Sequence, residues 1–264
     1  MTDDRLAIAR RAANAGGRIA SEMFRSDLAV GTKDGKTDYV TEADRRAQSR
    51  VVEVIRDADP DGAIVGEEGD RRKTVPAAGP AWIIDPIDGT KNYVRGLPLW
   101  ATAVAAVDGG RPIAAAIVAP KLGHTFTASA DTAWMDGDTI RVSERRDPEA
   151  MTVAPTYWWP MDRREEYGAA ASNIVERFGD LIRLGSAQLT LALVARGAID
   201  ATLTNRRMNP WDSVAGAFLV EVAGGTVTDI DGSPWHHDSP GLVASNGTAH
   251  ETAVAAAQAI RSGH

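Results

Sequence analysis

The sequence predicts a mixed α/β (α+β) fold, because its two halves carry different patterns of helices and strands. Before residue 147, two helical segments precede short apolar runs that are separated by glycine-rich turns. After residue 148, strand and helix patterns alternate, which is typical of α/β units. The segment 145–149, Arg-Arg-Asp-Pro-Glu, separates the two patterns. We therefore predict an N-terminal α+β subdomain at 1–147 and a C-terminal α/β subdomain at 148–264.

In the first half, apolar residues recur at three- and four-residue steps through 3–25 and from about 41 to 58, which predicts two amphipathic helices. The polar segment 27–40 between them is predicted to be a loop. Thr41 to Asp44 resembles a capping box at the start of the second helix. Apolar runs then predict a meander in an antiparallel or mixed sheet. Its strands are expected at 64–66, 82–85, 99–107, 112–119, 123–128 and 133–135.

In the second half, Pro210 and the Gly224-Gly225 pair mark the start and end of one expected helix. The other boundaries follow from the change between apolar runs and helical periodicity. Strands are expected at 151–155, 181–184, 199–203, 226–229 and 242–245, and helices at 163–177, 186–196, 210–223 and from 248 onward.

Charge and cysteine content exclude several classes of protein. The net charge of −7 argues against broad binding to nucleic acids or anionic membranes. The chain has no cysteine, which excludes disulfides, thiolate metal sites and cysteine-nucleophile phosphatases. The N-terminus lacks the apolar core of a signal peptide, and charged and glycine residues interrupt the apolar stretch 101–120. We therefore expect a cytoplasmic protein with no membrane segment.

The segment 82–92 reads Trp-Ile-Ile-Asp-Pro-Ile-Asp-Gly-Thr-Lys-Asn. Its apolar start predicts a buried strand that ends in Asp85 and Asp88, followed by a turn at Gly89. Two carboxylates this close repel each other and need a partner. Two interpretations stay open on this segment alone, a metal and phosphate site or an acidic surface turn.

Two further acids extend this pattern. Glu67 ends another predicted strand, and Asp212 lies in the first turn of a predicted helix. Each has a structural alternative, a surface turn for Glu67 and an interaction with the helix dipole for Asp212. If the four acids converge, however, the cluster requires cations. Oxygen ligands without Cys or His nearby favour Mg²⁺, with Mn²⁺ as a substitute.

These segments resemble the signatures of the inositol monophosphatase family, the Mg²⁺-dependent, Li⁺-sensitive sugar phosphatases. The resemblance rests on 66–68 (Gly-Glu-Glu), 82–93, 211–216 (Trp-Asp-Ser-Val-Ala-Gly) and 221–225 (Glu-Val-Ala-Gly-Gly), and it covers essentially the whole chain. It implies a layered α/β/α/β sandwich of the inositol monophosphatase and fructose-1,6-bisphosphatase type, with the active site between the two parts. It also implies a homodimer.

The resemblance further implies two or three Mg²⁺ ions per active site. One would lie among Glu67, Asp85, the Ile87 carbonyl and Thr90, a second among Asp85, Asp88 and Asp212, and a third near Glu67. Asp44 and Thr90 would activate the attacking water. The turn Asp88, Gly89 and Thr90 would bind the substrate phosphate, as a helix N-terminus can.

For the substrate, the resemblance implies contacts from Gly185, Ser186 and Ala187, from the loop residues Asn205, Arg206 and Arg207, and from Asp212. Polyol-specific members carry a glutamate in this loop, but 204–209 here reads Thr-Asn-Arg-Arg-Met-Asn. The two arginines lead to the hypothesis of a second anionic group on the substrate. The alternative is that they are solvated or reach a partner subunit.

Three further segments have open roles. Lys33 and Asp38 match a family loop near the site. The run Tyr157-Trp158-Trp159-Pro160 is interpreted as core packing, a pocket wall or a dimer interface. His236-His237 is predicted to lie in a surface turn.

The predicted function is Mg²⁺-dependent hydrolysis of a phosphomonoester of a small polyol or sugar, of the inositol-1-phosphate type, by metal-activated water. Alternative substrates are fructose 1,6-bisphosphate, histidinol phosphate and, less readily, 3′-phosphoadenosine 5′-phosphate. The alternative from another class is a regulatory binding protein on the same fold. A haloacid-dehalogenase phosphatase is disfavoured, because its Asp-x-Asp spacing is replaced here by Asp-x-x-Asp.

Overall fold

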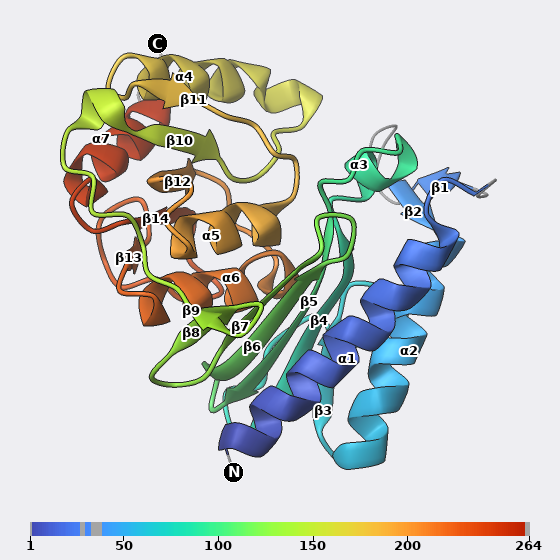
Figure 1. Cartoon of the computed structure of the whole chain (residues 1–264). Coiled ribbons are helices and arrows are strands. Elements are labelled where there is room, and N and C mark those ends of the chain that lie inside the picture. The colour runs from blue at the N-terminus through green and yellow to red at the C-terminus, as the bar shows by residue number, and fades with distance from the viewer. Residues whose placement is uncertain (1, 27–29, 33–38, 262–264) are drawn as a thin grey trace.

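The protein is described here by a computed structural model that covers residues 2–26, 30–32 and 39–261 (Figure 1). Within these residues, two large sheets organise the chain, one of seven strands in the order β3-β4-β5-β6-β7-β8-β9 and one of five in the order β11-β10-β12-β14-β13. The predicted α/β (α+β) class is confirmed.

The larger sheet is built from the first half of the chain. Its strands are β3 (Ala63–Gly66), β4 (Pro80–Asp88), β5 (Ala101–Asp108), β6 (Arg111–Ala119), β7 (His124–Ala128), β8 (Ala133–Met135) and β9 (Asp138–Thr139). β3 and β4 are parallel and the remaining neighbours are antiparallel, so the sheet is mixed, as predicted.

Helices cover both faces of this sheet (Figure 1). On one face lie α1 (Thr2–Met23) and α2 (Glu42–Ala58), and on the other lie α5 (Ala187–Ala195) and α6 (Pro210–Val222). Trp82 and Ile84 pack in the core beneath α1 and α2, whereas Ile83 packs with α5 and α6. This alternation is that of a strand buried on both faces, and it explains why β4 reads as a continuous apolar run.

The smaller sheet comes from the second half of the chain. Its strands are β10 (Thr152–Pro155), β11 (Asp180–Leu181), β12 (Ala201–Thr204), β13 (Thr226–Thr228) and β14 (Leu242–Ser245). Its inner face packs on α5 and α6, and α4 (Arg164–Val175) and α7 (His250–Arg261) cover the outer face. The predicted α/β/α/β layers are therefore present, and α4 and α7 add an outer helical layer (Figure 1).

The structure differs from the sequence prediction in a few connections. Val30–Thr32 and Tyr39–Thr41 pair as the short antiparallel strands β1 and β2, where the prediction was a loop. β4 continues to Asp88 instead of ending at Asp85, with a register irregularity between those two residues in its pairing with β5. β5 contributes the hydroxyl of Thr102, which donates to the Pro86 carbonyl at 2.7 Å, so the proline lies within the sheet.

The described residues also form the short helix α3 (Thr90–Val94) and the 3₁₀ turns Pro148–Ala150 and Met161–Arg163. One hydrophobic cluster joins Ala105 of β5, Leu189 of α5 and Ala244 of β14, and thus spans both sheets. The subdomain boundary at 147 stays a prediction. Among the described residues, no helix has both the length and the apolar character needed to cross a membrane.

Candidate active site

A cavity of about 510 Å³ lies where β4 ends, and both halves of the chain line it. The first half contributes Glu67 and the segment 85–91, apart from Pro86. The second half contributes residues from 156–158, 183–187 and 206–212. Most of the predicted site residues therefore meet in one place, although they are far apart in the sequence.

Three of the four predicted acids form a compact cluster in this cavity. Asp85, Asp88 and Asp212 each offer a carboxylate oxygen, and these oxygens lie within 4.8 Å of one another. Residues three apart in a regular strand point to opposite faces. The irregularity of β4 between Asp85 and Asp88 accounts for their convergence. Asp212 joins them from the first turn of α6, where Pro210 is at the first helical position.

Glu67 lies just after β3 and lines the same cavity, outside this group of three. Among the described residues that line the cavity, none is a histidine. The donor set is therefore made of carboxylate and carbonyl oxygens, which suits Mg²⁺ or Mn²⁺ rather than Zn²⁺. Carboxylates this close and this buried also need positive charge to be stable together, so the residues fit divalent cations.

Asp88 also hydrogen-bonds to the start of α5. Its carboxylate accepts hydrogen bonds from the Ala187 amide at 3.0 Å, from the Gln188 amide at 2.8 Å and from the Ser186 hydroxyl. Burial raises the pKa of Asp88, and these hydrogen bonds oppose that rise. Because α5 begins at Ala187, the acid fixes the start of this helix against the end of β4.

Asp44 and Thr90 also meet, from the first turn of α2 and the start of α3. The Thr90 hydroxyl lies 3.4 Å from Asp44 Oδ1 and 3.0 Å from the Ile87 carbonyl oxygen. Asp44 is fully buried. Gly89 makes this turn possible, since its φ is +94° and a Cβ there would lie only 3.0 Å from the Leu99 carbonyl oxygen and 3.1 Å from the Ser186 Cβ.

Comparison with known proteins places this geometry in a family. The family model described as "Inositol monophosphatase family" matches residues 1–262. The chain belongs to the inositol monophosphatase family. The resemblance predicted from the sequence is confirmed, and so is the expectation of a phosphatase of this family.

Individual relatives agree with this assignment. The chain is 37% identical over 230 residues to a fructose-1,6-bisphosphatase/inositol-1-monophosphatase of Thermotoga maritima, covering 85% of this chain and 84% of the relative. It is 36% identical over 251 residues to the Nus factor SuhB of Pseudomonas aeruginosa, covering 91% of each. The structure of an IMPase from Thermotoga maritima superposes with a TM-score of 0.89 at 34% identity, covering 98% of both chains.

Two residues that the sequence did not predict donate hydrogen bonds to Asp212. The Tyr157 hydroxyl donates to Asp212 Oδ2 at 3.2 Å, and Asn209 Nδ2 donates to the same oxygen at 2.9 Å. Burial and the nearby Asp212 carboxylate raise the pKa of Tyr157, so it is a protonated donor at neutral pH. The aromatic run 157–160 was the available signal, but the sequence does not show which ring faces an acid.

Cationic side chains line the cavity together with the acids. Arg206 lies over Tyr157 and Trp158, with 5.6 and 5.7 Å from the guanidinium carbon to the ring centroids, and its Nη1 donates to the Trp158 carbonyl oxygen at 2.9 Å. Lys91 Nζ lies 4.7 Å from the Trp158 ring centroid. Trp158 is thus part of the cavity wall, and Arg183 and Arg207 also line the cavity.

Some predicted residues do not reach the cavity. The Asn205 side chain is buried. Its oxygen accepts a hydrogen bond from Trp159 Nε1 at 2.8 Å, and its nitrogen donates to Glu166 at 2.5 Å, so both ends of the amide are hydrogen-bonded within the protein. Gly185 and Ala187 line the cavity, whereas Ser186 acts through Asp88. Trp159 is a core residue. Lys33 and Asp38 lie outside the described residues.

Proposed function

We propose that this family member hydrolyses a phosphomonoester of a small polyol or sugar with the help of Mg²⁺. The observation that carries the proposal is the cluster of Asp85, Asp88 and Asp212 in a cavity with cationic side chains on its wall. Such a cavity suits an anionic substrate whose negative charge is shared between bound cations and basic side chains.

Asp85, Asp88, Asp212, Glu67 and the Ile87 carbonyl would hold the metal ions. When bound, divalent ions lower the pKa of water and stabilise charge on a transferring phosphoryl group. Asp88 would reach them while its other hydrogen bonds keep β4 and α5 in place. Tyr157 and Asn209 would fix the orientation of Asp212, as partners of ligand side chains commonly do.

Asp44 and Thr90 would manage the proton of the attacking water. The Thr90 hydroxyl donates to Asp44 or to the Ile87 carbonyl and can accept a hydrogen bond in return. A buried carboxylate at this distance can take up the proton that passes through the hydroxyl. Gly89 and Thr90 would face the phosphate at the start of α3, where backbone amides lack helical partners.

A phosphate-release assay on about a dozen phosphorylated metabolites tests the proposal. We expect release from inositol 1-phosphate or a similar monoester that requires Mg²⁺, is supported by Mn²⁺ and falls when Li⁺ is added. Protein treated with a chelator and then resupplied with Mg²⁺ is the control. Release that is unaffected by the chelator, or no release from any substrate of the panel, would contradict the proposal.

A bisphosphate is the second candidate substrate, because Arg206, Arg207 and Arg183 line the cavity. Its support from comparison is the relative in Thermotoga maritima, which is named for both fructose-1,6-bisphosphatase and inositol-1-monophosphatase. Arg binds a phosphate group through two parallel hydrogen bonds, so these side chains would bind the phosphate that is not hydrolysed. Histidinol phosphate and 3′-phosphoadenosine 5′-phosphate stay in the panel as further alternatives.

Replacing both Arg206 and Arg207 by Ala is expected to raise KM for fructose 1,6-bisphosphate by about ten-fold or more, since a charged hydrogen bond contributes about 1.5–3 kcal/mol. The effect on inositol 1-phosphate is expected to be much smaller. Steady-state kinetics on both substrates measure the difference. Arg196→Ala, a surface change outside the cavity, is the control. Equal losses on the two substrates would exclude a selective role.

The predicted homodimer and cytoplasmic location stay predictions.

A regulatory binding role is the alternative from another class, and its support is the relative named Nus factor SuhB. An NMR chemical-shift titration or a pull-down with a purified partner protein would test a binding role. The acids and Thr90 that line the cavity favour catalysis.

A further inference from the structure

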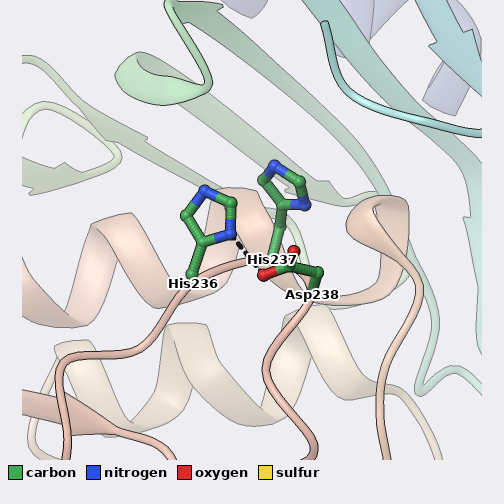
Figure 2. A group of neighbouring side chains, drawn as sticks. All are labelled: His236, His237 and Asp238. Carbon is green, nitrogen blue, oxygen red and sulfur yellow. Dashed lines mark hydrogen bonds and ion pairs between the residues drawn. The ribbon is translucent and has the colours of Figure 1, made fainter. Parts of the chain in front are cut away.

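A second group of potential metal ligands, separate from the cluster of acids, lies in the connection between β13 and β14. His236, His237 and Asp238 each offer one ligand atom, and the three atoms lie within 4.8 Å of one another (Figure 2). His236 Nδ1 lies 2.5 Å from Asp238 Oδ1. The phosphatase site uses none of these side chains.

The turn that carries these residues is held by its own hydrogen bonds. The His236 amide donates to Ser239 Oγ at 3.0 Å, and the Ser239 amide donates to the His236 carbonyl oxygen at 2.9 Å. Just before it, Thr228 and Pro234 form an antiparallel bridge. Three consecutive potential ligands are therefore kept in one short closed turn, which lowers the entropy lost when they bind an ion.

The first half of the chain borders the same space. A Cβ built on Gly110, in the turn between β5 and β6, would lie 4.0 Å from Nε2 of both His236 and His237. It would also lie 3.8 Å from the Pro76 carbonyl oxygen. Both imidazole nitrogens thus border one small space beside a glycine and close to an oxygen donor from another segment.

We propose that His236, His237 and Asp238 bind a Zn²⁺ ion. Two imidazole nitrogens and one carboxylate oxygen are a typical zinc donor set, and the fourth position would be taken by water or by the Pro76 carbonyl. This donor set differs from the oxygen ligands of the catalytic cavity, so the two sites select different metals. With the Pro76 carbonyl as the fourth ligand, a bound ion would link the 236–238 turn to the connection between β3 and β4, and so join the two halves of the chain.

Equilibrium dialysis of the full-length, tag-free protein against Zn²⁺ tests this proposal. A large excess of Mg²⁺ is present to occupy the oxygen site, and elemental analysis gives the bound metal. We expect about one Zn²⁺ per chain, and a loss of affinity of about ten-fold or more in His236→Ala and in His237→Ala. Zn²⁺ is also expected to raise the Tm of the unchanged protein more than that of either variant.

The matched control is His124→Ala. His124 is also a surface histidine paired with an aspartate, with its Nδ1 2.8 Å from Asp136 Oδ2. Its Zn²⁺ affinity and its Tm shift are expected to equal those of the unchanged protein. Zn²⁺ binding that is equally tight in both turn variants, or equally weakened in His124→Ala, would overturn the proposal. So would the absence of stoichiometric binding in the presence of Mg²⁺.

Discussion

Replacing Asp85 by Asn is expected to lower kcat/KM for a phosphomonoester by about a thousand-fold or more. Asp85 is 1% exposed and belongs to the carboxylate cluster, so the change removes one charge from the ligand set and alters little volume. Metal ions that stabilise transition-state charge contribute several kcal/mol, and about 4 kcal/mol corresponds to a thousand-fold in rate. Phosphate release is measured as Mg²⁺ is varied, and Mg²⁺ binding is measured by calorimetry.

Asp200 provides the matched control, because it is also 1% exposed but lies outside the cavity. Its carboxylate binds Arg145 Nη1 at 3.1 Å and the Thr152 amide at 2.9 Å. Asp200→Asn is therefore expected to lower the free energy of unfolding by about 1–3 kcal/mol and to leave the Mg²⁺ dependence unchanged. If Asp85→Asn keeps more than about a tenth of its kcat/KM, or keeps its Mg²⁺ dependence, Asp85 is not a metal ligand of this reaction.

The regular elements could be predicted because their patterns are local. The apolar run before Asp85 identifies a buried strand, and Pro210 with Gly224 identifies the limits of α6. The irregular continuation of β4 to Asp88 could not be predicted. It depends on pairing with β5 and on the hydrogen bond from Thr102 to the Pro86 carbonyl, and both are contacts with a strand that follows later in the chain.

The candidate site shows the same limit. The acids could be identified because charged residues at the ends of apolar segments are unusual and match the family signatures. Asn205 was predicted to contact the substrate. Its side-chain oxygen instead accepts a hydrogen bond from the indole of Trp159, which is 46 residues away in the sequence. Tyr157 was not predicted to hold Asp212, because only the folded chain brings the two hydrogen-bonding groups within 3.2 Å. Side-chain partners distant in sequence are thus the part that patterns do not reveal.

Removing the Thr90 hydroxyl is expected to lower kcat by about a hundred-fold or more. Thr90→Val preserves the shape of the side chain but leaves Asp44 without the hydroxyl that lies 3.4 Å from its Oδ1. Positioned proton transfer contributes about 10²- to 10⁴-fold to enzymatic rates, and such contacts are often long before substrate binds. Because α3 begins at Thr90 and Val keeps the branched Cβ, the helix is expected to remain. Steady-state phosphate release at saturating Mg²⁺ gives kcat.

Thr90→Ser is the matched control, since it keeps the hydroxyl and is expected to retain most of the activity. Asp44→Asn should lower kcat to a similar extent as Thr90→Val. If the two residues act as one proton-transferring unit, the double variant Asp44→Asn/Thr90→Val loses little more than either single variant, because the second change removes a group that no longer functions. Losses that multiply in the double variant would mean that Asp44 and Thr90 contribute to kcat separately and do not form one proton-transferring unit.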